Sequence, residues 1–456
     1  MSKQGRQLGM LDGAALVVST VIGAGIFTVP SIVASLTGSG SGFIVVWVVG
    51  GVLAIAGALS YAELASRFPQ AGGEYVYLRE AFGPVAGFLS GWTSFIAGFS
   101  GAIAASAVGF GRYLTPIWPG LGGPPFARLA AGPLTLTISP ITLVAAGLIL
   151  LFTAVAVAGL ESSRRTNNAL AVLLILGIVT FVVGGIVGQS GVQSAAATPS
   201  LTPGGFTGVA AALVPVMFTY SGWNAAAYVA SEFDTPRWTV PRALTLGAAV
   251  VTVLYVALNA TYLRALSVGG IAATPTPGEG TAAVILGAAH RNWLTPVVLL
   301  ALASSVCAMV ITGPRIYLQM APDGAMPRAF AAVRDGDGFP VTSIVLQSIW
   351  SCVLVLTGTF DAIVTYTGFA VVLFAGAAVA SLFVFRRRDT QRWSGYRVWG
   401  FPVAPAAFVI ASALMLEATI AREPLPSLAG VALMAAGLPL YVWSKRASRE
   451  SSVVSR

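Results

Sequence analysis

Charge is what this sequence has least of. Only 9% of its 456 residues are Asp, Glu, Lys or Arg, whereas about 25% are charged in a typical soluble protein. Water cannot solvate a surface with so few charged groups, so lipid has to cover most of it. The hydrophobic share of 56% and the mean hydropathy of +0.84 agree with this. The composition therefore excludes an ordinary soluble protein and predicts an all-helical integral membrane protein.

Cysteine and histidine are nearly absent as well. Cys307 and Cys352 both fall in apolar segments, so they cannot form the disulfide framework of a secreted domain. The single histidine, His290, lies in a loop and receives no specific role. The sequence has no His–Glu metal motif, no Gly-x-Ser-x-Gly motif and no phosphate-binding P-loop. These absences argue against an enzyme, and against an ATP-driven pump unless a partner supplies the ATPase.

Long charge-free runs are what the sequence does have. A transmembrane helix needs roughly 20 apolar residues to cross about 30 Å of hydrocarbon. By that rule we expect about twelve spans in one transmembrane domain over residues 1–456. Spans one to five are expected at about 10–190, six to ten at about 206–385, and eleven and twelve at about 398–444. The fourth is expected within residues 129–160.

The basic residues alternate between the two sides of these spans. Roughly 20 of the 25 fall in every second loop or at the termini, which is the positive-inside pattern. This places both termini in the cytoplasm and the chain in the cytoplasmic membrane. The net charge of +9 therefore reflects topology and not binding to nucleic acid. The five basic residues on the other side are Arg112, Arg128, Arg264, Arg291 and Arg422.

The first span contains an expected interruption at Ser19–Phe27. Gly23 and Gly25 flank Ala24, and glycine lets a backbone leave the helical path. Unwinding would expose backbone N–H groups at the positive end of the next half-helix, which suits a carboxylate. Close helix packing through small residues is the alternative, and the 52 glycines of the chain keep it open.

The sixth span contains a second expected interruption, at Phe218–Asn224. Polar and aromatic residues gather there around Gly222 at membrane depth, and Pro215 removes a backbone hydrogen bond one turn earlier. An interfacial aromatic belt is the alternative. It fits poorly, because the charged end of this span comes later, at Glu232.

The two interruptions occupy equivalent spans if the chain repeats after five helices. Paired interruptions in two halves indicate a midplane substrate site in an inverted-repeat transporter. The repeat rests on this spacing, since the halves show no convincing residue-by-residue similarity. A secondary transporter explains the pairing, the topology and the missing cofactor motifs. A channel or an amino acid sensor built on the same fold stays open.

Short motifs follow one another along nearly the whole chain. They are Gly23-Ala24-Gly25-Ile26-Phe27, Tyr61-Ala62-Glu63-Leu64, Phe68-Pro69-Gln70-Ala71-Gly72-Gly73-Glu74-Tyr75, Tyr220-Ser221-Gly222-Trp223-Asn224, Ser231-Glu232-Phe233, Gly313-Pro314-Arg315, Asp323-Gly324-Ala325-Met326-Pro327 and Tyr396-Arg397-Val398-Trp399-Gly400-Phe401-Pro402. Each alone is a weak signal, but their order is specific. In this order the chain resembles the amino acid–polyamine–organocation (APC) superfamily, most closely its L-type amino acid transporter-like bacterial branch.

The resemblance implies a LeuT-type fold, with a five-plus-five inverted repeat and two further C-terminal helices. It implies a permease or exchanger that moves neutral L-amino acids by alternating access. The substrate carboxylate would meet the N–H groups of Ala24 and Gly25, and Phe218 would be a lid. The amine would meet main-chain carbonyls of both interruptions, and Asn224 would be a polar contact. The implied substrate-binding residues are Val21, Ile22, Gly23, Ala24, Gly25, Ile26, Phe218, Tyr220, Ser221, Gly222 and Asn224.

The chain departs from many relatives in its fifth span. Leu174 stands where they carry a lysine that fills a former sodium site or moves a proton. The segment Ala301–Ser305 resembles the sodium-site motif of more distant relatives. The candidate cation site comprises Ser19, Ile22, Ala301, Ser304 and Ser305. Serines that only bond back along their own helix are the alternative. No cofactor is expected beyond a coupling ion, Na⁺ or H⁺.

Acidic residues bear on the choice of substrate. No acidic residue lies near either interruption in the sequence, and a cationic substrate would want one there. A zwitterionic amino acid is therefore favoured over a cationic amino acid or a polyamine. Glu63, Glu74 and Glu80 are expected to pair with arginines such as Arg67 or Arg315. The expected partners are the substrate and the lipid bilayer, with no protein partner required.

Overall fold

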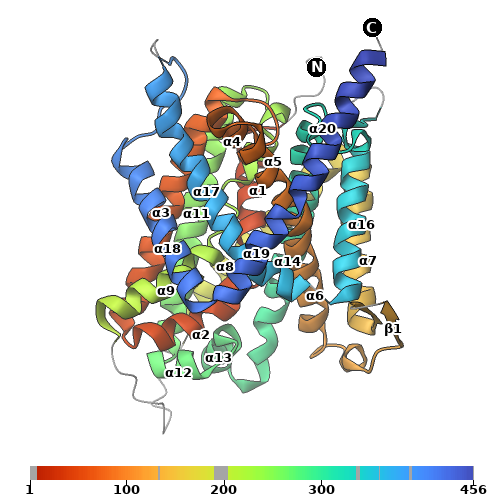
Figure 1. The fold of residues 1–456 in the computed structure, drawn as a ribbon. Coiled ribbons are helices and arrows are strands. Elements are labelled where there is room, and N and C mark those ends of the chain that lie inside the picture. The colour runs from red at the N-terminus through yellow and green to blue at the C-terminus, as the bar shows by residue number, and fades with distance from the viewer. Residues whose placement is uncertain are drawn as a thin grey trace.

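The computed structural model describes residues 8–131, 134–188, 204–334, 339–358, 360–389 and 393–454, and it is almost entirely helical (Figure 1). Among these residues, nine helical segments are long and apolar enough to cross a membrane. A bent pair of helices passes the same test together. The nine segments are Gly40–Arg67 (α3), Pro84–Leu114 (α5 to α6), Pro140–Val157 (α7), Leu160–Val187 (α8), Pro236–Ala265 (α11), Ala288–Met320 (through α14 and α15), Gly368–Arg388 (in α17), Val403–Arg422 (α18) and Pro424–Lys445 (α19 into α20).

The expected class, an all-helical membrane protein, is thus confirmed. Two apolar helices are shorter, Gly205–Thr219 (α9) with 15 residues and Val341–Thr357 (α16) with 17. Twelve spans require both of them to cross together with the bent pair. The full count and the inverted repeat stay predictions.

The fourth span lies within the expected residues 129–160 but occupies only the later part of that run. Residues Ala127–Ala131 (β1) and Leu134–Ile138 (β2) form an antiparallel hairpin, and α7 begins only at Pro140. The stretch Leu-Thr-Leu-Thr-Ile alternates with a period of two, which is the periodicity of a strand. The Ser139 hydroxyl then accepts from the Thr142 N–H at 3.2 Å and caps the new helix. The first part of the charge-free run is therefore a strand, which the sequence analysis did not identify.

The two expected interruptions are both present. Helix α1 (Met10–Val21) ends and α2 (Gly25–Thr37) begins after an extended residue, Ile22, with a bend of 53°. Helix α9 ends at Thr219, and the chain resumes as the short helix α10 (Ala225–Tyr228). Between them Gly222 has a φ of +107°, which favours glycine. Both segments thus put non-helical backbone inside the bundle.

The bundle has two distinct ends. Helix α4 (Glu74–Phe82) and the end of α20 (Gly437–Val454) lie at one of them, called the α4 end below (Figure 1). Helices α12 (Val268–Ala273) and α13 (Pro277–Leu286) lie at the other, the α13 end (Figure 1). Long helix α11 packs along α3 and α1 between the ends. The two interruptions lie against this central group.

Candidate functional site

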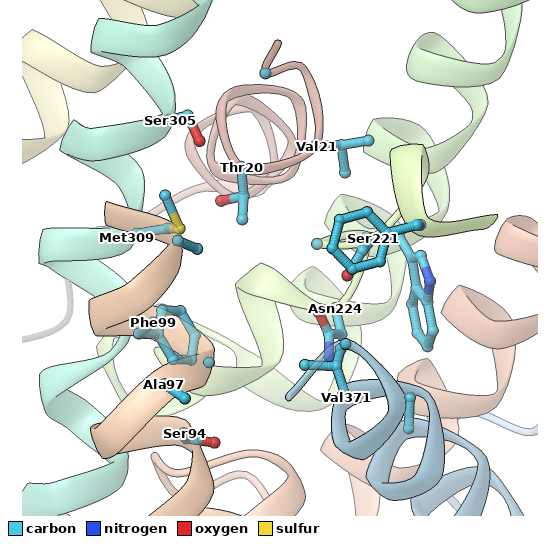
Figure 2. Close-up of a pocket in the computed structure, with 18 of the residues that line it drawn as sticks. Thr20, Val21, Ser94, Ala97, Phe99, Ser221, Asn224, Ser305, Met309 and Val371 are labelled. Carbon is cyan, nitrogen blue, oxygen red and sulfur yellow. The ribbon is translucent and has the colours of Figure 1, made fainter. Parts of the chain in front are cut away.

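A pocket of about 270 Å³ lies where the two interruptions meet. Its walls come from the α1–α2 break, the α9–α10 break, the segment from α5 to α6, α14 and α17. Figure 2 shows Thr20, Phe99, Ser221, Asn224 and Met309 around a common open space. The lining is mixed, with hydroxyls and one amide among apolar side chains. Such a mixture suits a small amphiphilic ligand.

The two interruptions touch each other directly. A Cβ added at Gly222 would lie 2.8 Å from Thr20 Cγ2, too close for any side chain. A Cβ added at Gly25 would lie 3.1 Å from Thr219 Cγ2. Glycine at both positions therefore lets one unwound backbone lie against the other.

Tyr255 of α11 ties the two broken ends together. Its hydroxyl lies 2.9 Å from the Val21 carbonyl oxygen and 3.2 Å from the Thr219 carbonyl oxygen. These carbonyls end α1 and α9, where no next turn supplies an N–H. The sequence analysis missed Tyr255. A tyrosine in the middle of an apolar span was the available signal, because its buried hydroxyl needs a partner.

The predicted substrate-binding residues divide into two groups. The pocket is lined by Val21, Gly23, Gly25, Phe218, Ser221, Gly222 and Asn224. The others, Ile22, Ala24, Ile26 and Tyr220, pack into or against the hydrophobic core behind it. Tyr220 donates its hydroxyl to the Trp47 carbonyl at 3.1 Å, which anchors the second break to α3. Four of the predicted residues therefore meet the pocket with main chain at most.

The start of α2 offers free backbone donors. The first N–H groups of a helix have no carbonyl four residues earlier to bond. Phe27 donates to the Ala24 carbonyl at 3.1 Å. In the described part of the chain, no acceptor pairs with the N–H of Gly25, which lines the pocket. A carboxylate placed there would meet this N–H and the positive end of a 13-residue helix.

Phe218 lines the pocket without covering it. Its side chain is 48% exposed. A Cβ at Gly368 of α17 would lie 3.4 Å from Phe218 Cε2, so that glycine leaves room for the ring. The ring thus stands at the wall of the pocket between the α9–α10 break and α17.

The candidate cation residues also come together in part. Ser304 donates to the Ser19 hydroxyl at 2.8 Å, across α14 and α1, and both side chains are fully buried. Ser305 lines the pocket, facing Thr20 (Figure 2). Ala301 and Leu174 are fully buried in the core. Hydroxyls and carbonyls fit a hard cation in donor type. Among the described residues, no group of three or more His, Cys, Asp or Glu could hold a metal ion.

The expectation of no acid near the breaks is wrong. Glu74 lines the pocket and accepts from the Asn224 amide at 2.8 Å. Gly72 and Gly73, with φ of +108° and +47°, turn the chain back into the bundle before α4. Glu74 therefore reaches the second break, 150 residues later in the chain. The sequence separation concealed this, although two glycines before an acid were a usable signal.

The expected pairing of the acids with arginines holds for only some of them. Glu63 contacts Arg67 at 2.8 Å and Arg386 at 2.5 Å, and the Val398 N–H also donates to it. Glu74 pairs with no arginine among the described residues, and its ion pair was wrongly expected. The Glu63 cluster joins α3 to α17 at the α4 end.

Arg315 is paired elsewhere than expected. It contacts Glu232, just after the α9–α10 break, at 2.7 Å. Leu8, ahead of α1, also bridges to Phe233. The buried Arg315–Glu232 ion pair and the Leu8–Phe233 backbone contact therefore fasten the chain between the two breaks and the α4 end.

The family model described as "Amino acid permease" matches residues 8–441. Large neutral amino acids transporter small subunit 2 of Homo sapiens is 28% identical, over 96% of this chain and 80% of its own length. The cystine/glutamate transporter of Homo sapiens is 26% identical, over 97% and 86%. The serine/threonine exchanger SteT of Bacillus subtilis (strain 168) is 25% identical, over 97% of both chains.

Proposed function

The chain belongs to the amino acid permease family, and from this premise we propose that it moves neutral L-amino acids across the cytoplasmic membrane by alternating access. One observation carries the proposal. Two unwound backbone segments meet at one pocket, and a helix N-terminus faces it. The relatives compared above are transporters and not enzymes, and each is named for amino acids.

A zwitterion fits the proposed site by charge. The substrate carboxylate would lie at the start of α2, near Gly25 and the N–H of Ala24. The substrate amine would lie at the carbonyl ends of α1 and α9 and near the Ser221 carbonyl. The Val21 carbonyl already accepts from Tyr255, but a carbonyl oxygen has two lone pairs. Main-chain groups thus bind what all amino acids share, and side chains such as Phe99 and Met309 would meet the variable part.

Alternating access is supported by the contrast between the two ends. At the α4 end, Glu232 and Arg315 are buried as a pair, while Phe218 on the other side of the break is 48% exposed. We propose that this state opens toward the α13 end and is closed at the α4 end. The positive-inside pattern makes the α4 end cytoplasmic. Twelve spans in a five-plus-five repeat with two additional helices complete the proposed topology.

Glu74 favours a second candidate substrate. A carboxylate at the pocket wall could meet a cationic side chain, so a cationic amino acid or a polyamine is the alternative. A sensor that binds amino acids without moving them is a further alternative. We propose that the chain transports amino acids without a protein partner.

Uptake by proteoliposomes tests this proposal. The purified chain should take up labelled serine, threonine, alanine or leucine, and excess arginine or putrescine should not compete. Running the assay with and without sodium, a pH gradient and internal amino acid separates symport from exchange. Binding without uptake would identify a sensor, and uptake of arginine alone would overturn the neutral substrate.

Phe218→Ala tests the site within the same assay. Removing the ring takes away the proposed lid, so uptake should fall sharply while the protein remains in the membrane. The control is Phe206→Ala, at the exposed start of the same helix, which should transport as wild type does. Wild-type uptake by Phe218→Ala would refute the role of the Phe218 ring as a lid.

A further inference from the structure

The acid at the wall of the pocket, Glu74, has no ionic partner in the part of the chain that the structure describes. Glu74 is the first residue of α4 and is only 8% exposed. A buried carboxylate is costly unless a cation or several donors compensate it. Its environment therefore decides whether it is ionised.

Neutral groups surround the Glu74 carboxyl. The Tyr61 hydroxyl donates to Oε1 at 2.6 Å, and the Asn224 amide donates to the same oxygen at 2.8 Å. The Asn224 amide also donates to the Tyr228 hydroxyl at 2.9 Å. Tyr77 is the remaining titratable neighbour. Burial raises the pKa of Glu74 above its ordinary value, although these hydrogen bonds oppose the shift.

The charged groups on the surrounding elements are engaged with one another. On α4, Arg79 pairs with Glu80 and with Asp323. On α3 and α17, Arg67 and Arg386 pair with Glu63. After α10, Glu232 pairs with Arg315. Each of these arginines is thus held by an acid other than Glu74, and Arg388 of α17 donates instead to the Glu80 and Ala81 carbonyls of α4.

Glu63 makes the comparison within the same molecule. It is buried as Glu74 is, but it contacts two guanidinium groups and a backbone N–H. That set of partners suits a permanently ionised carboxylate. Glu74 has only neutral partners among the described residues, which suits a carboxyl that gains and loses a proton.

The position of Glu74 couples its exposure to the second break. Asn224 and Tyr228 belong to the short segment that follows that break in the chain. The Gly72 N–H donates to the Tyr228 carbonyl at 3.1 Å, and a Cβ at Gly73 would lie 2.6 Å from the Tyr228 ring. Opening the α4 end by moving this segment would take the Asn224 amide away from Glu74 and admit water.

We propose that Glu74 is the site that binds and releases a proton transported together with the amino acid. In the closed arrangement the carboxyl holds the proton that reached it through the pocket. When the α4 end opens, water solvates the carboxylate and the proton leaves on that side. Glu74 binds one proton and releases one proton in each cycle, so the carboxyl returns to its starting state. The inference rests on the proposed function, because only a transporter can carry the proton across.

Proteoliposomes that contain the pH dye pyranine test the inference. A neutral amino acid added outside wild-type vesicles should acidify their lumen and accumulate further under an inward proton gradient. Glu74→Gln should still exchange amino acid for amino acid, but without acidification and without stimulation by the gradient. Glu80→Gln, on the same helix and outside the pocket, should behave as wild type. Proton movement that persists in Glu74→Gln would overturn the proposal.

Further outcomes separate the two proposals. Wild-type exchange without any proton movement would overturn the role of Glu74 and leave amino acid transport intact. No transport of neutral amino acids by wild type would instead defeat the proposed function. Arginine uptake that is lost in Glu74→Gln, without acidification, would make Glu74 a contact for cationic side chains.

A binding measurement keeps the test decisive if Glu74→Gln does not fold. Binding of a neutral amino acid to the wild-type protein should weaken as the pH rises past the Glu74 pKa, by up to about tenfold per pH unit. Affinity that is independent of pH would overturn the inference. Glu74→Asp, which keeps a carboxyl, should retain the acidification signal with a shifted midpoint.

Discussion

Tyr255 gives the sharpest test of how the two breaks are held. The Tyr255→Phe variant keeps the ring and removes only the hydroxyl, which lies 2.9 Å from the Val21 carbonyl oxygen and 3.2 Å from that of Thr219. A hydroxyl has one proton, so these carbonyls share one donor. Side-chain hydrogen bonds inside membrane proteins contribute about 0.6 kcal/mol on average and up to about 1.7. An unpaired buried carbonyl costs about 1–3 kcal/mol.

We therefore expect the variant to disfavour the closed pairing of the breaks by about 1–2 kcal/mol. If that cost falls on substrate binding, the dissociation constant rises about 5- to 30-fold. The assay is equilibrium binding of a labelled neutral amino acid, followed by the KM of uptake in proteoliposomes. KM should rise with the dissociation constant, while the amount of protein in the membrane stays the same.

Tyr262→Phe is the matched control. Tyr262 lies on the same helix and is fully buried like Tyr255, but its hydroxyl has no hydrogen-bond partner among the described residues. Losing it should leave binding unchanged. Equal effects of the two variants would show that burial of a tyrosine matters and that the bridge between the breaks does not.

Two further predictions concern the backbone and the acid. Gly222→Ala and Gly287→Ala both place a side chain at positive φ, +107° and +90°, where each costs about 1–3 kcal/mol of backbone strain. At position 222 the Cβ would also collide with Thr20, at 2.8 Å, whereas position 287 is open. Uptake should therefore be lost only in Gly222→Ala. Equal uptake by the two variants would contradict the close approach of the two breaks. Burial raises the pKa of Glu74 and the Asn224 amide opposes this by donating to the carboxylate. Asn224→Ala should therefore move the midpoint of pH-dependent binding to higher pH, measured as affinity against pH, and a shift to lower pH would count against that hydrogen bond.

Composition and glycine placement predicted the features that local chemistry controls. The low charge indicated a membrane bundle, and the glycines around Ala24 and at position 222 marked both breaks. These predictions succeeded because backbone unwinding depends on residues that are neighbours in sequence. The hairpin before α7 was also predictable from neighbouring residues, because its side chains alternate with a period of two, but this local signal was overlooked.

Contacts between distant segments were not predictable in this way. Tyr255 reaches Val21 across 234 residues, and Asn224 reaches Glu74 across 150. Neither pairing follows from spacing or composition, because each depends on how the helices pack. The substrate argument from missing acids failed at this point. Nearness in sequence was taken for nearness in space.

Glu63 and Glu74 show how one short segment can serve two purposes. Only the last turn of α3 and the loop before α4 separate them, and both are buried. The helical path of α3 directs Glu63 to Arg67, one turn away, and to Arg386 of α17, so its charge joins two helices. The turn at Gly72 and Gly73 directs Glu74 to the moving break, where cations are absent from its described contacts. A fixed charge that fastens the α4 end and a titratable one that responds to its opening are what proton coupling requires from that end of the bundle. Giving Glu74 a cationic neighbour, as Glu63 has, should hold its carboxylate ionised. The affinity for a neutral amino acid should then no longer depend on pH.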